Sequence, residues 1–536
     1  MMLLLWVSFA VATPADIQRC LEANDVPCAK REVQSIQAES SADGDVLALA
    51  ANTRFYAGEY EEALSLMQKA VAAGHQDRWD DLGLYERTAL VMADWAEVRD
   101  ADFVVRYRPG MDAILLEEAR ETLSSTRKNL SPLMGGQPSG PVILEIYPDG
   151  RSFTAASSLT EKDVQTTGVV ALSKWSRLLL TSPRALGRGY EWKDTVAHEY
   201  IHRMVSQYTE DQAPVWLQEA IAKYLDNRWR DGKDHFHLGP RDEGLLARAI
   251  REEGTPPGPD DDPNAHRGLV SFDQMHPSLA KLPTAEMAAL AYAQLASLMS
   301  YCFEKGGEDV LVRVLPRVKQ GVDPRIALAE GAGAANFGAL EKEWLEWLKK
   351  QKLQDREAEE LPTVLDGANE AESDPVLSGR EDLQRWMRLG DLLREKGHAK
   401  AALVEYAKAY NPEEPPSPLL ANRVAQAHLA LGDLAAARAS LEESREVYPE
   451  FALTHKTLGQ IFKEQKQVRA ALDSFRRAAD LNPFDPEVQQ ALASLYSQTG
   501  DSAGAARHER YMRILRRGGP EAGEVTLIRE MQTSEP

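Results

Sequence analysis

The chain contains one run, HEYIH, whose residue types and spacing suit a metal site. His198 and His202 stand four residues apart, so on a helix both imidazoles project from one face and can hold one zinc ion. Glu199 lies between them, where a carboxylate can act as general base on a water molecule at the metal. Catalytic zinc takes a third protein ligand and keeps its fourth position for water. We expect that third ligand to be Glu219, in the run WLQEA that follows.

The segment around the histidines has the pattern of an amphipathic helix that begins near Asp194. The two histidines and Glu199 share one side, and the apolar residues fall on the other: Val196, Ala197, Tyr200, Ile201, Met204 and Val205. The pattern therefore turns His198, Glu199 and His202 toward a cleft or toward solvent. The alternative is a solvated helix face that carries two histidines by chance, because random matches to so short a motif occur.

A second helix is expected shortly after, because Pro214 suits the first position of a helix. Glu219 and Asp226 lie opposite its main apolar stripe, together with Val215 and Ala222. Small residues beside two carboxylates suit close packing against a helix that presents a metal. Asp226 is thus a candidate outer partner of the metal ligands. An ordinary surface carboxylate remains the alternative for Glu219.

The two segments together resemble the gluzincin metallopeptidases, a peptidase MA-like group of thermolysin- and aminopeptidase-type enzymes, in the runs DTVAHEYIHRMV and APVWLQEAIAKYLD. The resemblance extends over roughly residues 100–350. It implies an α+β zincin-like peptidase domain, with a small sheet followed by active-site helices. It also implies Zn²⁺ held by His198, His202 and Glu219, with Glu199 as general base. Gluzincins usually have Gly where this chain has Ala220, whose methyl group could crowd the approach of the two helices.

The same resemblance implies two further features of the site. The last strand, at the edge of the sheet, would bind extended peptide through main-chain hydrogen bonds. A downstream Tyr or His often stabilises the oxyanion in this group, and Tyr292 is the candidate here, with core packing as the alternative. His235 and His237 lie in an irregular segment. They are candidates to contact substrate or metal, with an ordinary loop position as the alternative.

Composition and charge narrow the class of protein. A chain of 536 residues is expected to form two to four domains. The formal net charge of −21 argues against a general binder of nucleic acid or of anionic membranes, since either would be repelled. Three cysteines do not make a disulfide scaffold. No G-x-S-x-G motif, P-loop lysine or paired C-x-x-C offers a different chemistry.

The N-terminus predicts export. Residues 1–15 are interpreted as a signal peptide, because Met1 to Ala12 are uncharged and small residues follow for cleavage. The protein would then be periplasmic or extracellular, and an uncleaved segment would leave it membrane-associated. This run is too short to span a bilayer, and no later stretch is long and apolar enough to do so. Cys20 and Cys28 either pair in an oxidising compartment or are separate thiols, and Cys302 is expected in the core.

Two further parts precede the histidines. Residues 16–100 are predicted to be helical, with a tetratricopeptide-like hairpin at 42–75 and a second hairpin at 79–100. From residue 101 the periodicity changes, and a peptidase domain is predicted to extend to residue 350. This domain is expected to contain a sheet of three to four strands, at 103–107, 142–147, 168–172 and 177–180. One amphipathic helix is expected at 111–130.

The C-terminal part carries a repeat. Residues 351–380 are polar and acidic and are interpreted as a linker. Within residues 381–517, small residues recur at intervals of 34 or 35 in two columns: Gly390, Ala425, Gly459 and Ala493, and Ala402, Ala437, Ala471 and Ala505. This period is typical of tetratricopeptide repeats, and four of them suffice to stack a continuous core. Residues 255–264 are expected to form a surface loop, and residues 518–536 a disordered tail.

Two functions follow from these patterns. The first is an exported zinc metallopeptidase that hydrolyses peptide bonds, whose repeats recruit a protein substrate or partner. The second is a non-catalytic tetratricopeptide scaffold that carries a degenerate peptidase fold. The intact HEYIH run and Glu219 favour the first, because loss of catalysis usually removes a ligand or the base. We also predict that deletion of residues 381–536 leaves the zinc content unchanged and alters the choice of substrate or partner.

Overall fold

The computed structural model describes residues 12–517 except for residues 139, 161, 165–167, 254–265, 355–360, 362, 364, 367–370, 372–373 and 413. Residues 1–11 of the predicted signal peptide lie outside the described residues, as do the predicted loop at 255–264 and the tail at 518–536. Within the described part of the chain, no helix has both the length and the apolar character needed to cross a bilayer.

A five-stranded mixed sheet lies at the centre, in the order β1-β2-β3-β5-β4. Strands β2, β3 and β5 run parallel, and β1 and β4 join the two edges antiparallel. The bounds are β1 Ala96–Arg99, β2 Phe103–Tyr107, β3 Val142–Tyr147, β4 Ala171–Lys174 and β5 Arg177–Thr181. The strands predicted at 103–107, 142–147 and 177–180 are confirmed, whereas the strand predicted at 168–172 begins only at Ala171.

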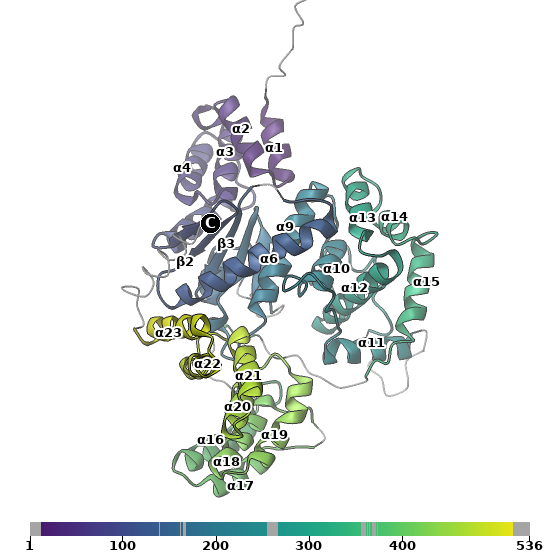
Figure 1. The fold of residues 1–536 in the computed structure, drawn as a ribbon. Coiled ribbons are helices and arrows are strands. Elements are labelled where there is room, and N and C mark those ends of the chain that lie inside the picture. Colours follow the sequence, from purple (N-terminus) through teal and green to yellow (C-terminus); the bar gives the residue numbers. More distant parts are fainter. Residues whose placement is uncertain are drawn as a thin grey trace, which may run out of the picture.

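Different helices cover the two faces of the sheet, because side chains along a strand alternate in direction (Figure 1). Leu144, Ile146 and Leu178 belong to the main core, in which α6 Leu116–Met134 and α9 Trp192–Thr209 pack on one face. Tyr147 and Leu179 belong to a smaller core under α7 Gly150–Ala155 on the other face. The long helix predicted at 111–130 is found as the short turn η2 Met111–Leu115 followed by α6.

The N-terminal helices pack at one end of this sheet (Figure 1). They are α1 Pro14–Glu22, α2 Val26–Ser35, η1 Ala38–Ser40, α3 Gly44–Tyr56, α4 Tyr60–Ala72 and α5 Asp81–Met92. A disulfide between Cys20 and Cys28 joins α1 to α2. The hydroxyl of Tyr60 hydrogen-bonds to the buried carboxylate of Glu145 in β3, which also pairs with Arg177 at 3.1 Å. This buried polar cluster fixes the hairpin of α3 and α4 to the sheet.

The prediction of a helical hairpin at 79–100 is wrong in its second half. Only α5 is helical, and β1 then pairs with β2 through the register Glu97 to Arg106 and Val98 to Val105. The carboxylate of Glu97 accepts from Arg106 at 2.9 Å, and Val98 is buried. Tertiary pairing with a partner strand therefore outweighs the helical preference of this short stretch.

The helices that follow α9 complete the main core. They are α10 Val215–Leu225, α11 Pro240–Glu252, α12 Ala285–Gly306, α13 Val310–Lys319, α14 Pro324–Gly331 and α15 Phe337–Leu348. Two short turns lie nearby in the chain, η3 Pro183–Ala185 before α9 and η4 Leu279–Lys281 before α12. Cys302 in α12 is fully buried, which confirms its predicted core position. Helix α10 contacts both α9 and α12, so its residues lie between these two longer helices.

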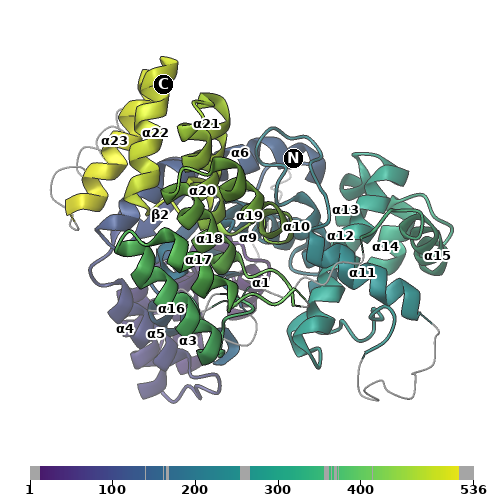
Figure 2. The same cartoon turned by 90° about the horizontal axis from the view of Figure 1, so that it is seen from below.

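Four helical hairpins form the C-terminal repeats, at the end of the molecule opposite the N-terminal helices (Figures 1 and 2). Their helices are α16 Glu381–Glu395, α17 Ala399–Ala407, α18 Pro418–Ala430, α19 Leu434–Val447, α20 Ala452–Glu464, α21 Val468–Leu481, α22 Pro486–Thr499 and α23 Ser502–Arg517. A Cβ at Gly390 would lie 2.3 Å from the ring of Tyr406, so only glycine allows this approach of α16 and α17. The predicted column of small residues thus packs the paired helices.

The end of the predicted linker 351–380 is not a solvated spacer. Asp374 is fully buried and accepts hydrogen bonds from the hydroxyl of Ser417 at 2.8 Å and the backbone N–H of Leu419 at 2.9 Å. Leu377 is also fully buried, in the core of the first repeat. The polar composition of this stretch concealed its contact with the start of α18, because a capping Asp and a solvated Asp look alike in a sequence.

Candidate metal centre

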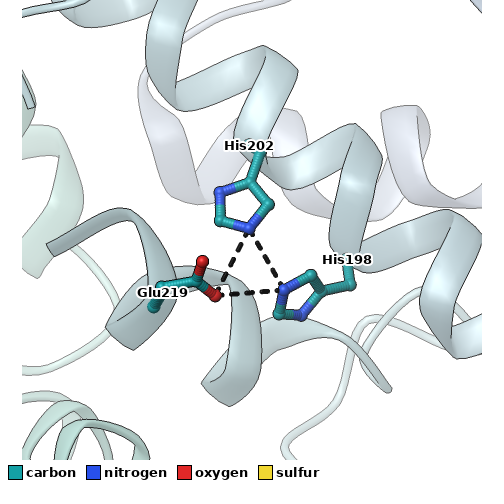
Figure 3. A group of neighbouring side chains, drawn as sticks. All are labelled: His198, His202 and Glu219. Carbon is teal, nitrogen blue, oxygen red and sulfur yellow. Dashed lines mark hydrogen bonds and ion pairs between the residues drawn. The ribbon is translucent and has the colours of Figure 1, made fainter. Parts of the chain in front are cut away.

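Helix α9 presents both histidines toward α10, one turn apart (Figure 3). The ring centroids of His198 and His202 lie 4.8 Å apart, and their Nε2 atoms are 3.1 Å apart. Both side chains are less than one-fifth exposed. The opposite side of α9 is formed by Val196, Tyr200, Ile201 and other fully buried residues of the main core. The arrangement has the sidedness that the sequence pattern predicts.

Helix α10 brings the carboxylate of Glu219 to the two imidazoles. Its Oε2 lies 3.3 Å from Nε2 of His198 and 3.5 Å from Nε2 of His202, and Figure 3 shows the resulting triangle. Across the described residues, this is the one group of three or more potential ligands whose atoms all lie within 4.8 Å of one another. Ala220 is fully buried at the neighbouring position, so its methyl group is accommodated and does not keep Glu219 from the histidines.

Neighbouring charges shift the pKa of His198 and the pKa of Glu219. Burial lowers the pKa of His198, but the carboxylates of Asp226 and Glu219 outweigh it and raise that pKa to about 10. Burial opposes the shift at Glu219, yet His202 and His198 hold its pKa far below the usual range. The ionised carboxylates therefore favour a positive charge at this position, which is a proton on His198 here and which a divalent cation could replace.

Asp226 lies on the other side of His198, just after α10. Its Oδ2 is 3.8 Å from Nδ1 of His198 and 3.4 Å from Nζ of Lys223. Burial raises the pKa of Asp226, and the charges of Lys223 and His198 lower it by more, so the carboxylate is held ionised. Nε2 of His198 takes part in the triangle, and Nδ1 is the nitrogen nearest Asp226. Lys223 was not singled out from the sequence, where its spacing of three residues from Asp226 was the available signal.

Glu199 occupies the space between the histidine pair and the edge of the sheet. It is 8% exposed, and burial raises its pKa while the neighbouring histidines and the backbone of Ser173 lower it. Ser173 belongs to β4, the edge strand next to β5. The net upward shift moves the carboxylate toward the range in which a general base operates near neutral pH.

The structure brings Tyr292 to this site and leaves the two loop histidines outside it. Tyr292 packs against the main core from α12, and burial together with the charges of Glu219 and Glu199 raises its pKa. His235 instead pairs with Asp231 at 2.9 Å and is half exposed, and Nδ1 of His237 lies 3.0 Å from the carbonyl of His235. The ordinary loop position therefore describes these two histidines.

Comparisons with known proteins assign no family to the chain. No family model matches it, and neither does any curated protein. Among solved structures, MamA from Desulfovibrio magneticus RS-1 is 21% identical with a TM-score of 0.23, over 26% of this chain and 78% of that one. PilF from Pseudomonas aeruginosa is 13% identical with a TM-score of 0.23, over 45% and 99%. Native yeast LTA4 hydrolase is 11% identical with a TM-score of 0.31, over 78% and 67%.

Likeness at these TM-scores carries no argument about this chain. What the chain itself contains is an array of tetratricopeptide-like helical hairpins joined to a domain with one small mixed sheet. The class of protein is therefore a repeat protein with an additional α+β domain, and the chemistry of that domain depends on its own residues.

Proposed function

We propose that this protein is a zinc-dependent peptidase whose metal ligands are His198, His202 and Glu219. The observation that carries the proposal is the triangle of Nε2, Nε2 and Oε2 atoms, with sides of 3.1, 3.3 and 3.5 Å. Ligands about 2.0 to 2.2 Å from a tetrahedral zinc ion lie about 3.3 to 3.6 Å from one another. The three sides lie within about 0.2 Å of this range, so the donor atoms need only a small adjustment to hold zinc.

Zinc would supply a Lewis acid that polarises the scissile carbonyl and makes a nearby water more acidic. Glu199, buried beside the ligand pair, accepts the proton from that water and returns it to the leaving amine. Asp226 orients the imidazole of His198. Tyr292, from α12, would donate a hydrogen bond to the oxygen that becomes negatively charged; the influence of Glu219 and Glu199 on its pKa supports this role.

The edge of the sheet supports a peptide as the substrate. Strand β4 is an edge strand, and the backbone of its Ser173 lies close enough to Glu199 to lower the pKa of that carboxyl. The edge and the proposed base are therefore adjacent. An extended peptide adds to such an edge through main-chain hydrogen bonds, which places a backbone carbonyl beside the base. Export is part of the same proposal, supported by the uncharged run from Met1 to Ala12 and by the Cys20–Cys28 disulfide, since disulfides persist in oxidising compartments.

The alternative function is a scaffold that binds proteins through its repeats and performs no chemistry. The four repeat hairpins favour it, because stacked tetratricopeptide repeats are a common protein-binding architecture and need no active site. On this reading the three donor atoms would bind no metal, or would hold one without cleaving anything.

Substitution of Glu199 by Gln separates the two functions. The variant keeps the shape of the side chain but cannot accept a proton, so we expect one zinc per chain as in the wild type and a loss of peptide cleavage of roughly 10²- to 10⁴-fold. Zinc is measured by elemental analysis and cleavage by profiling on a peptide library. Glu210→Gln, at an exposed position just after α9, is the matched control and should keep full activity.

Two results would count against the peptidase. Unchanged cleavage in Glu199→Gln would exclude the general-base role. Absence of zinc in the wild-type chain, or zinc that persists in His198→Ala, would exclude the proposed ligands and leave the scaffold as the better description.

A further inference from the structure

Residues 187–191, here called the bridging segment, lie between the short turn η3 that follows the sheet and helix α9 that carries the histidines. It lies against the edge of the C-terminal repeats where one hairpin passes to the next. The backbone N–H of Ala452 donates to the carbonyl of Arg188 at 3.2 Å, and the N–H of Tyr190 donates to the carbonyl of Leu481 at 3.1 Å. The side-chain amide of Asn482 donates to the carbonyl of Gly187 at 3.5 Å. The repeats thus hold this segment by its main chain.

Gly189 permits the closest part of this contact. Its φ is +74°, and a Cβ placed there would lie 2.6 Å from the carbonyl oxygen of Leu481. That atom belongs to the backbone at the end of α21 and cannot rotate away. At Gly187, by contrast, an added Cβ would meet nothing within 4 Å. Gly189 is therefore required both by its left-handed backbone and by the close approach to Leu481, and Gly187 is required by neither.

Ion pairs continue the contact into the first turn of α9. The guanidinium of Arg477 in α21 donates hydrogen bonds to both carboxylate oxygens of Glu191, and the bond from Nη1 to Oε2 is 2.9 Å long. Lys193 pairs with Asp480 of α21 and also with Glu118 of α6 at 3.2 Å. Glu191 is the N-cap residue, directly before the first residue of α9. Helix α21 therefore contacts the start of the helix on which both proposed histidine ligands lie.

We propose that the repeat array acts within its own chain and positions the metal centre by holding the start of α9, with Arg477 and Asp480 as the positioning residues. The inference rests on the proposed zinc site. His198 lies about 10 Å along the helix from Glu191, at 1.5 Å per residue, so the helix transmits displacement of its first turn to both histidines. Metal ligands tolerate displacements of only about 0.5 Å. If the repeats position the metal ligands, deletion of residues 381–536 should weaken zinc binding. The proposal therefore replaces the expectation that this deletion leaves the zinc content unchanged.

The paired glycines supply the first test. In Gly189→Ala, we expect faster hydrogen exchange over residues 186–196, because the bond from Tyr190 to Leu481 is strained, and release of zinc to a chelator about tenfold faster than in the wild type. Gly187→Ala is the matched control, with exchange and zinc release as in the wild type. If Gly189→Ala behaves like Gly187→Ala in both measurements, the docking is not what holds the segment, and the proposal fails.

The ion pair supplies the second test. Glu191→Arg and Arg477→Glu each break the pair, and the double variant restores it with the charges exchanged. If the two substitutions acted independently, the rate of zinc release from the double variant would increase by the product of the two single-variant increases. We expect a rate about tenfold below that value, because the exchanged pair re-forms and the two residues are directly coupled. The cycle also removes the separate effect of placing Arg at the positive end of a helix.

The two measurements distinguish this inference from the proposed function. Hydrogen exchange reports the docking without zinc, so wild-type protein that binds no zinc but shows the Gly189→Ala exchange effect would overturn the peptidase and leave the docking in place. Faster exchange in Gly189→Ala with unchanged zinc release would show that the array docks without positioning the ligands. That result would overturn the inference alone.

Discussion

Asp226 lies beside His198, on the side of the ring away from the proposed ligand triangle. Its carboxylate lies 3.8 Å from Nδ1, the ring nitrogen that is not in the ligand triangle, and it is held ionised by Lys223. We expect Asp226→Asn to weaken zinc binding by about 10- to 100-fold, because the amide keeps the shape but not the charge that makes the imidazole a stronger donor. Competition with a chelator measures this affinity.

Asp231→Asn is the control for this substitution. Asp231 pairs with the exposed ring of His235, outside the ligand triangle, so the loss of its charge should leave zinc affinity unchanged. Equal effects of the two substitutions, or none, would show that Asp226 does not orient His198.

At the residue scale, the sequence predicted which side chains meet. The spacing of His198 and His202 placed them on one face of a helix, and the polar side of the second helix carried Glu219 and Asp226 toward that face. The sequence did not predict that Glu199 would lie against Ser173, because that contact joins a helix to the edge of a sheet whose order no local pattern reveals.

At the element scale, the long periodic helices and the buried strands β2, β3 and β5 were predictable, and the edge strand β1 was not. The columns of small residues in the repeats recur often enough to specify each hairpin, and Gly459 against the ring of Phe475 shows why, since a Cβ there would lie 2.9 Å away. Strand β1 has only four residues and one buried side chain, so it carries almost no period of its own. It forms because β2 offers it a partner, which is information held elsewhere in the chain.

The last repeat contains a pH-sensitive contact between its two helices. His508 of α23 is 8% exposed, stacks on Tyr496 of α22 with ring centroids 5.3 Å apart, and has Nδ1 2.6 Å from the amide oxygen of Gln489. Burial, together with the charges of Arg507 and Arg476, lowers the pKa of His508 to about 4. The folded state therefore keeps this imidazole neutral where the unfolded state would take up a proton.

Stability should fall as the pH falls through this interval. Above pH 6.5, the pKa of histidine in the unfolded state, His508 is neutral in both states and its full contribution to the free energy of unfolding is present. Between pH 6.5 and about 4 only the unfolded state takes up the proton. The free energy of unfolding then falls by about 1.4 kcal/mol per pH unit, or about 3 kcal/mol in all. His508→Phe keeps a ring and removes the titration. We expect the difference in free energy of unfolding between wild type and variant to shrink from pH 7 to pH 4.5, as measured by denaturant titration. A difference that stays constant would contradict the assignment.

At the scale of the whole molecule, the repeats and the sheet domain share structure that the sequence presented as separate parts. Arg477 and Glu191 are 286 residues apart, and neither residue differs in pattern from an ordinary surface charge. Arg507 of α23 likewise pairs with Glu117 of α6 at 2.6 Å. Contacts of this kind depend on the complementarity of two finished surfaces, so they could not be read from local periodicity.

Tyr511 of the last helix tests whether the two parts are stable as one unit. Its ring is fully buried in the same core as α6 and α9, although the residue belongs to the repeats. Replacement of a buried aromatic side chain by Ala removes about 3 to 5 kcal/mol of stability. If the core is shared, Tyr511→Ala destabilises the sheet domain as well as the last hairpin.

Tryptophan emission can measure whether Tyr511→Ala destabilises the sheet domain. Of the ten tryptophans, only Trp386 lies beyond residue 350, so the signal reports mainly on the N-terminal helices and the sheet domain. We expect Tyr511→Ala to lower the denaturant midpoint seen by tryptophan emission, whereas Tyr410→Ala, at a 60% exposed position in the repeats, leaves it unchanged. An unchanged midpoint in Tyr511→Ala would mean that the sheet domain holds its fold without the repeats, and that the array only rests against it.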